Sequence, residues 1–245
     1  MRSNQPRSFF SHRLFRLALC AAFAVSVAAV SSAGAQDQGK ADEAGSPPGP
    51  ADKPAPNPLQ KPALANQKAP EKFRVQFDTT QGKIVLEVNR AWSPNGVDRF
   101  YNLVEIGFFE DIAFFRVIPN FMAQFGIHGT PAINRVWQRA TIKDDPVVES
   151  NKRGMLSFAK TNRPNSRTTQ IFINFGDNLN LDGMGFSPFA RVVEGMDVVD
   201  KIYQVGEGGP RGPGPSQRRI QQLGNPFLEE KFPKLDYIKS AKAIE

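Results

Sequence analysis

Hydrophobic and polar residues alternate in two short runs near the middle of the chain. Residues 73–77 and 84–88 read FRVQF and IVLEV, and the polar residues 80–83 lie between them. Alternation with a period of two directs one side of a strand into a core and the other toward solvent. The pattern therefore predicts a β-hairpin with one buried face.

A helical period follows this hairpin. Ser93 and Pro94 are typical of a helix start, with serine as N-cap and proline in the first position. Apolar residues then recur at helical spacing as far as Gly107, where the helix is expected to end. A second amphipathic helix is predicted over residues 195–203.

Short strand-like runs separate these two helices. They cover residues 112–118, 121–127, 154–159, 170–175 and 189–193. Many short strands, two helices and frequent glycine turns favour a closed or nearly closed β-barrel with helical plugs. We assign residues 73–205 to this domain. Residues 206–245 are expected to form a loop, one or two short helices and a last strand at 235–243, packed on the domain.

The first 35 residues have the features of a secretory signal. Four arginines precede the apolar run LALCAAFAVSVAAV, and small residues follow it up to Ala35. We predict cleavage after Ala35 and a periplasmic or secreted protein without stable membrane insertion. The alternative is an uncleaved anchor, but the run is shorter than the roughly 20 strongly apolar residues that a spanning helix needs.

Residues 36–72 are rich in proline and alanine and poor in bulky apolar side chains. Such a segment buries too little surface to offset the entropy of ordering it. We predict a disordered, semi-extended linker here.

Composition narrows the chemistry further. The 245 residues carry a net charge of +7, and removal of the four signal arginines lowers it to +3, which does not favour a nucleic-acid partner. The chain has one cysteine and two histidines, so neither an internal disulfide nor a thiolate or histidine metal site is expected. We expect no cofactor, no metal and a monomer.

The most informative stretch is residues 114–124, FFRVIPNFMAQ. It resembles the signature of the cyclophilin family of peptidyl-prolyl cis-trans isomerases. Three later stretches, at 154–159, 170–173 and 181–196, resemble the family's following segments in the same order. The resemblance implies a mainly β fold: a cyclophilin-like closed eight-stranded antiparallel β-barrel with two capping α-helices. It also implies isomerisation of X–Pro amides in proline-containing polypeptides.

That reaction breaks no bond, so the enzyme must favour a twisted amide over both planar forms. A rigid, always charged donor aimed at the prolyl nitrogen lowers the barrier, and arginine suits this task. Arg116 matches the family's essential arginine. The other positions that match substrate-binding residues of the family are Phe121, Met122, Gln124, Ala159, Lys160, Thr161, Gln170, Phe172 and Leu181.

Several positions depart from the family pattern. Asn180 stands where eukaryotic members often have a tryptophan, so weak inhibition by cyclosporin is expected. A histidine that lines the family's pocket is missing, and Gly185 or Phe186 occupies the equivalent position. These departures keep one alternative open: a non-catalytic module of the cell envelope that binds proline peptides. Asp144 and Asp145 are interpreted as part of an exposed loop rather than as a metal or glycosidase site.

Overall fold

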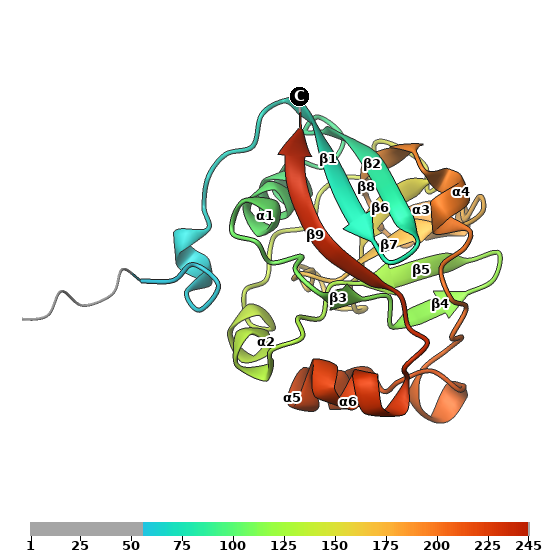
Figure 1. Cartoon of the computed structure of the whole chain (residues 1–245). Coiled ribbons are helices and arrows are strands. Elements are labelled where there is room, and N and C mark those ends of the chain that lie inside the picture. The colour runs from blue at the N-terminus through green and yellow to red at the C-terminus, as the bar shows by residue number, and fades with distance from the viewer. Residues whose placement is uncertain (1–55, 245) are drawn as a thin grey trace, which may run out of the picture. The chain divides into compact units, whose positions relative to one another are not determined.

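The computed structural model describes residues 56–244 (Figure 1). The predicted signal peptide and most of the predicted linker lie outside these residues. The predicted hairpin is confirmed, since β1 (Lys72–Thr79) and β2 (Gly82–Asn89) pair antiparallel with Phe77 opposite Ile84. The first predicted helix is also confirmed as α1 (Pro94–Glu105).

The other strands join this hairpin in one sheet. They are β3 (Ile112–Ala113), β4 (Arg116–Ile118), β5 (Met122–Phe125), β6 (Met155–Phe158), β7 (Ile171–Asn174), β8 (Pro188–Glu194) and β9 (Tyr237–Ile244). The order across the sheet is β3-β9-β1-β2-β8-β6-β7-β5-β4, and every pairing is antiparallel.

The sheet has nine strands where eight were expected. The predicted strand over 112–118 divides in two, because β3 pairs with β9 whereas β4 pairs with β5. At the break, the Phe114 amide donates to the Asp236 carbonyl and the Phe115 amide to the Gln124 carbonyl. Only Phe114 and Phe115 separate β3 from β4, so the first and last strands of this order are consecutive in the chain.

Besides α1, residues 56–244 contain α4 (Met196–Val199) and two helices that were not expected, α2 (Pro131–Trp137) and α3 (Asn180–Gly183). The one or two short helices expected after residue 205 are present as α5 (Gln217–Leu223) and α6 (Asn225–Lys231). The helix predicted over 195–203 is shorter than expected, since α4 ends at Val199. No helix among the described residues has the length and apolar character that crossing a bilayer requires.

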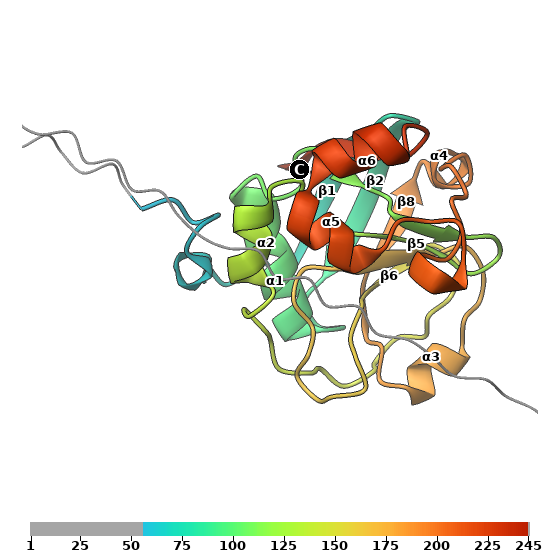
Figure 2. The ribbon, with the colours of Figure 1, turned by 90° about the horizontal axis from the view of Figure 1, so that it is seen from below.

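The C-terminal part packs on the sheet in two ways. Strand β9 lies between β3 and β1, and α5 contacts both α2 and α6. Figure 2 shows α5 and α6 across one end of the sheet, with α2 beside them. This arrangement brings residues after 205 next to the β4–β5 edge.

Residues before the predicted domain boundary at residue 73 already contact the domain. A short 3₁₀ turn spans Pro62–Leu64, and the Ala69 amide donates to Asp98 of α1 at 3.0 Å. The Trp137 indole donates to the Leu59 carbonyl at 2.8 Å. Residues 59–71 are thus held by hydrogen bonds to α1 and α2, which composition alone does not reveal.

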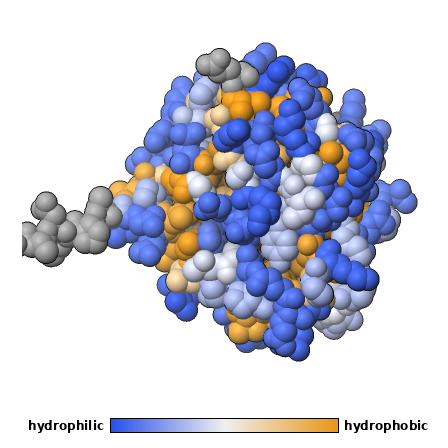
Figure 3. All heavy atoms as spheres, viewed as in Figure 1, coloured by the Kyte–Doolittle hydropathy of each residue, from blue (hydrophilic) through white to orange (hydrophobic). Residues whose placement is uncertain are grey.

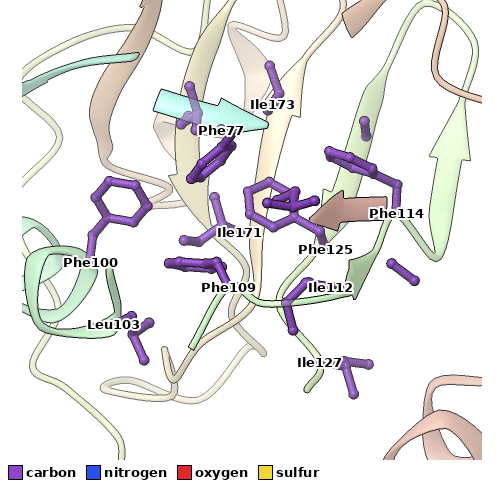
Figure 4. Close-up of a cluster of buried hydrophobic side chains, with 14 of the residues drawn as sticks. Phe77, Phe100, Leu103, Phe109, Ile112, Phe114, Phe125, Ile127, Ile171 and Ile173 are labelled. Atoms are coloured by element: carbon purple, nitrogen blue, oxygen red, sulfur yellow. The ribbon is translucent and has the colours of Figure 1, made fainter. Parts of the chain in front are cut away.

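The core between the sheet and α1 is rich in phenylalanine (Figure 4). Phe77 contacts Phe100, Phe109 and Phe125 with ring centroids 5.7–6.1 Å apart. Burial of one such side chain contributes roughly 1.5–3 kcal/mol. Viewed as in Figure 1, the surface is mostly hydrophilic with small apolar areas between polar ones (Figure 3).

One loop differs from its sequence interpretation. Asp145 is buried, although it was expected on an exposed loop. Its carboxylate accepts hydrogen bonds from the Ser93 hydroxyl at 2.6 Å and the Gly96 amide at 2.9 Å, and it pairs with Arg167. Asp145 therefore caps α1 from another segment, and the Ser93 side chain donates to that cap instead of forming it.

Candidate active site

The central arginine of the site is placed by the register of two short strands. Arg116 on β4 lies directly opposite Gln124 on β5, so both side chains leave the same face. The Arg116 Nη1 group donates to Gln124 Oε1 at 3.1 Å. Gln124 in turn donates to Gln170 Oε1 at 2.9 Å, which extends this polar row.

An apolar cluster lies beside this row and is separate from the main core. It consists of Met122, Phe172 and Leu181, which β5, β7 and α3 provide. Half-buried apolar side chains packed against it are Ile118, Phe121, Ala159 and Phe186. Together they form a continuous apolar surface beside the polar row.

The polar row and the apolar cluster line one cavity of about 420 Å³. All ten residues that the sequence singled out line it: Arg116, Phe121, Met122, Gln124, Ala159, Lys160, Thr161, Gln170, Phe172 and Leu181. Phe186 also lines it, with its ring centroid 5.8 Å from that of Phe172. Phe186 rather than Gly185 thus faces the cavity in the segment whose register was open.

The Arg116 side chain is held from two sides. Its guanidinium carbon lies 5.7 Å from the centroid of the Phe121 ring. On the other side, Nε and Nη2 donate to the two carboxylate oxygens of Glu207 at 2.7 and 2.6 Å. The hydrogen bond from Arg116 is the largest influence that lowers the pKa of Glu207, so this carboxylate is charged at neutral pH.

The segment after β6 forms the far wall of the cavity. The Ala159 amide donates to the Gln170 carbonyl at 2.9 Å, which continues the sheet beyond its last assigned residues. The Lys160 ammonium lies 5.5 Å from the centroid of the Phe186 ring. The Thr161 amide donates a hydrogen bond to the Ser166 hydroxyl at 3.0 Å, which holds this segment against the following turn.

Sequence reasoning missed a third wall of the cavity. It comes from α2, with Asn134 and Trp137, and from α5, with Gln217 and Gln221. Thr130 followed by Pro131 is a helix-start signal that would have revealed α2. The i, i+4 spacing of Gln217 and Gln221 places them on one helix face, but no local signal shows that this face meets the cavity.

His128 lies near this wall without lining the cavity. Burial lowers its pKa to about 4, so the imidazole is neutral at pH 7. Its Nδ1 atom accepts a hydrogen bond from the Thr130 amide at 2.9 Å. His128 therefore supports the loop before α2 and supplies no charge to the site.

Comparisons with known proteins agree with this geometry. The profile of the family described as "Cyclophilin type peptidyl-prolyl cis-trans isomerase/CLD" matches residues 74–224. Peptidyl-prolyl cis-trans isomerase cyp18 of Streptomyces antibioticus is 38% identical over 151 residues, which cover 56% of this chain and 87% of that protein. Peptidyl-prolyl cis-trans isomerase B of Escherichia coli is 39% identical over 142 residues, covering 55% of this chain and 86% of that protein.

A solved structure supports the fold independently. The crystal structure of cyclophilin AquaCyp293 from Hirschia baltica superposes with a TM-score of 0.51 at 20% identity, covering 71% of this chain and 75% of that chain. At this identity the likeness concerns the fold alone, while the family profile spans most of the domain that carries the cavity. The chain belongs to the cyclophilin-type peptidyl-prolyl cis-trans isomerase family.

Proposed function

We propose that this protein catalyses rotation about X–Pro amide bonds in unfolded or flexible polypeptides, with Arg116 as the catalytic residue. The observation that carries the proposal is the position of the Arg116 guanidinium at the edge of the apolar cluster, with Nη1 beside Met122 and Gln124. A proline ring in the cluster brings its nitrogen to the same edge.

The chemistry requires only positioning and electrostatics. Amide resonance sets a barrier of roughly 18–20 kcal/mol. As the amide twists, the prolyl nitrogen becomes pyramidal and its lone pair becomes available to a donor. A guanidinium N–H fixed near that nitrogen stabilises the twisted state more than either planar state, and this difference is what accelerates rotation.

The Nη1 group has room to act in this way. One of its acceptors is the Met122 thioether at 3.7 Å, and sulfur is a weak acceptor. A substrate nitrogen can replace this contact at little cost. Met122, Phe172 and Leu181 hold the ring by apolar contact, which suits a saturated five-membered ring.

The remaining wall residues bind the chain on either side of proline. Gln124 and Gln170 carry amide groups at the cavity, and each amide both donates and accepts. Ala159, Lys160 and Thr161 run along the cavity beyond the end of β6, where an extended peptide backbone can lie beside them. We propose that this wall determines which residues are preferred immediately before the proline of the substrate.

The proposed setting is the periplasm or the exterior of a bacterial cell, where the protein assists folding of exported proteins as a monomer. The proposed export rests on the sequence of residues 1–35. N-terminal sequencing of the protein recovered from the periplasm should begin at Gln36. Recovery of the whole chain from the membrane fraction would instead support an uncleaved anchor.

The isomerase assay decides between catalysis and binding alone. The cis-to-trans rate of a proline-containing tetrapeptide is measured with the wild type, with Arg116→Ala and with Arg191→Ala. Arg191 is the matched control because it also pairs with a glutamate, Glu87, but on an exposed part of β8. We expect Arg116→Ala to lower kcat/KM by about 10²-fold to 10³-fold.

The control variant should retain the wild-type rate. A binding module gives a different result: the wild type and Arg116→Ala both leave the spontaneous rate unchanged, while nuclear magnetic resonance shifts still report bound peptide. That outcome would replace the isomerase proposal with the non-catalytic alternative.

A further inference from the structure

Glu207 lies in a glycine- and proline-rich loop that the sequence left without a function. The loop, residues 205–215, joins the segment after α4 to α5 and contains the short 3₁₀ turn Gly209–Arg211. From it Glu207 reaches back to Arg116, 91 residues earlier in the chain. Its carboxylate therefore contacts the proposed catalytic group directly.

Backbone contacts hold Glu207 at this place. Gly206 bridges Val117 of β4, and its amide donates to the Val117 carbonyl at 2.9 Å. Val117 follows Arg116 and Glu207 follows Gly206, so the bridge places the arginine and the glutamate side by side. Gly206 has φ +83°, which favours glycine at the position before Glu207.

The opposite side of the loop also fits closely around Glu207. A Cβ atom on Gly212 would lie 2.4 Å from the Glu207 carbonyl oxygen, so only glycine allows this approach. The Gly214 amide donates to the same carbonyl at 2.9 Å. The backbone is therefore fixed on both sides of Glu207, and this restricts where its carboxylate can lie.

The contacts divide the guanidinium into two functional sides. Nε and Nη2 bind the carboxylate in a two-point contact, which fixes the plane of the group. Nη1 is left on the cavity side, beside Gln124 and Met122. A two-point carboxylate contact thus prevents the arginine from rotating away, and it directs one nitrogen to the place where a prolyl nitrogen would lie.

We infer that Glu207 is a positioning residue of the isomerase: it orients the Arg116 guanidinium so that Nη1 faces the prolyl nitrogen. The inference rests on the proposed function of Arg116. It adds the loop at 205–215 to the active site, although that loop contributes no apolar lining to the cavity. Orientation in advance of binding removes an entropic cost from the reaction step.

The test compares Glu207→Gln, Glu207→Ala and Glu87→Gln for kcat and KM with the same tetrapeptide. Glu87→Gln is the matched control, because Glu87 also binds two nitrogens of an arginine, Arg191, away from the cavity. We expect Glu207→Gln to lower kcat by roughly 10-fold, since misplacing a catalytic group by about 1 Å can cost up to about 10²-fold. KM should change little because the ring-binding residues are intact.

The alanine variant should lose more activity than the glutamine variant, because glutamine keeps one acceptor oxygen. A second readout separates positioning from a structural effect. The Nε–H resonance of Arg116 should exchange slowly with water in the wild type and in Glu87→Gln, and rapidly in Glu207→Gln. Urea unfolding should show that the variants remain folded under the assay conditions.

The outcomes are distinct. Unchanged or increased kcat in Glu207→Gln, with Arg116→Ala inactive, would overturn the positioning role and leave the proposed function intact. Full activity in Arg116→Ala would overturn the proposed catalytic residue itself. Loss of kcat in Glu207→Gln, with altered Nε–H exchange, supports both.

Discussion

Two arginines of this protein bind carboxylates, and their surroundings differ sharply. The Arg167–Asp145 pair is buried, with 2% and 1% of the two side chains exposed. The Arg116–Glu207 pair lies at the cavity, with 21% and 32% exposed. The first joins three parts of the chain, whereas Arg116 of the second lines the cavity. The same chemical pair therefore has a structural use in one place and a proposed catalytic use in the other.

The hydrogen bonds explain this division. Asp145 accepts from Ser93, Asn95 and Gly96 as well as from Arg167, so its oxygens are fully engaged with the start of α1. Arg167 also donates to the Lys143 carbonyl. Glu207 has fewer partners, namely Arg116 and the Gly208 amide at 3.2 Å. Several donors hold the buried Asp145 carboxylate in place, whereas the pair at the cavity leaves Nη1 available to a ligand.

The largest difference between the pairs should appear in stability. Asp145→Ala removes the buried carboxylate that binds Arg167 and the start of α1, and it leaves the guanidinium with the more distant Asp144 at 3.5 Å. It should lower the free energy of unfolding by about 3–5 kcal/mol. Glu207→Ala breaks a partly exposed pair and should lower it by at most about 1 kcal/mol. Urea denaturation followed by circular dichroism measures both. Equal losses would show that burial does not separate the two pairs.

Replacing each arginine by lysine should separate stability from turnover. Lysine keeps the charge but loses the planar fork. Arg116→Lys should lower kcat/KM by about 10-fold to 10²-fold with little change in stability. Arg167→Lys should lower the free energy of unfolding by about 1–3 kcal/mol, because buried acceptors lose their donors.

The control in this experiment is the turnover of the folded Arg167→Lys protein. It should stay within about twofold of the wild type, because Arg167 does not line the cavity. A fall of kcat as large as that in Arg116→Lys would mean that the two pairs are coupled.

The cavity residues were predictable because the family resemblance identified them, and the register of the strands brings them to one face. Arg116 lies opposite Gln124, and Gln124 lies opposite Phe172, so residues from three motifs meet on one face of the sheet. Every residue of β5 and of β7 is buried, so alternation along these two strands does not reveal which face lines the cavity. The family resemblance then distinguished pocket residues from ordinary core residues.

The residues that were missed lie in loops, where the sequence has no helical or strand periodicity to interpret. Glu207 belongs to a loop of glycine and proline, and its partner in β4 is remote in sequence. Asp145 precedes a proline and resembles a solvated loop residue, and only the fold brings it to the start of α1. The ninth strand was missed for a similar reason: residues 112–118 divide between two partners, β9 and β5, and this choice of partners is a long-range event.

Acid should affect the two pairs unequally. Burial acts to raise the pKa of Asp145, but hydrogen bonds from Ser93, Gly96, Asn95 and Arg167 outweigh it, and the pKa is lowered from 3.8. A carboxyl whose pKa is lower in the folded state stabilises the fold above its unfolded pKa, and that contribution is lost as pH falls through the folded pKa. The pKa of Glu207 is also lowered, so its contribution has the same sign.

Unfolding at several pH values between 7 and 2 tests this expectation. The wild type should lose stability below about pH 4. Asp145→Asn should remove more of this acid dependence than Glu207→Gln, because the Asp145 carboxylate is less exposed and has more donors. If Glu207→Gln reduces the loss of stability at low pH more than Asp145→Asn does, the buried pair is not the main acid-sensitive contact of the two.

Salt should produce the smallest effect and act on the cavity pair alone. The Debye length falls from about 10 Å at 0.1 M salt to about 3 Å at 1 M, and exposed charges are screened far more than buried ones. The stability cost of Glu207→Gln should therefore shrink by up to about 0.5 kcal/mol between these concentrations, while the cost of Asp145→Asn stays constant. Urea unfolding at both salt concentrations measures the two costs. A cost of Asp145→Asn that falls with salt as steeply as that of Glu207→Gln would mean that solvent ions reach the buried pair, and the contrast between the two arginines would then lie in their hydrogen bonds alone.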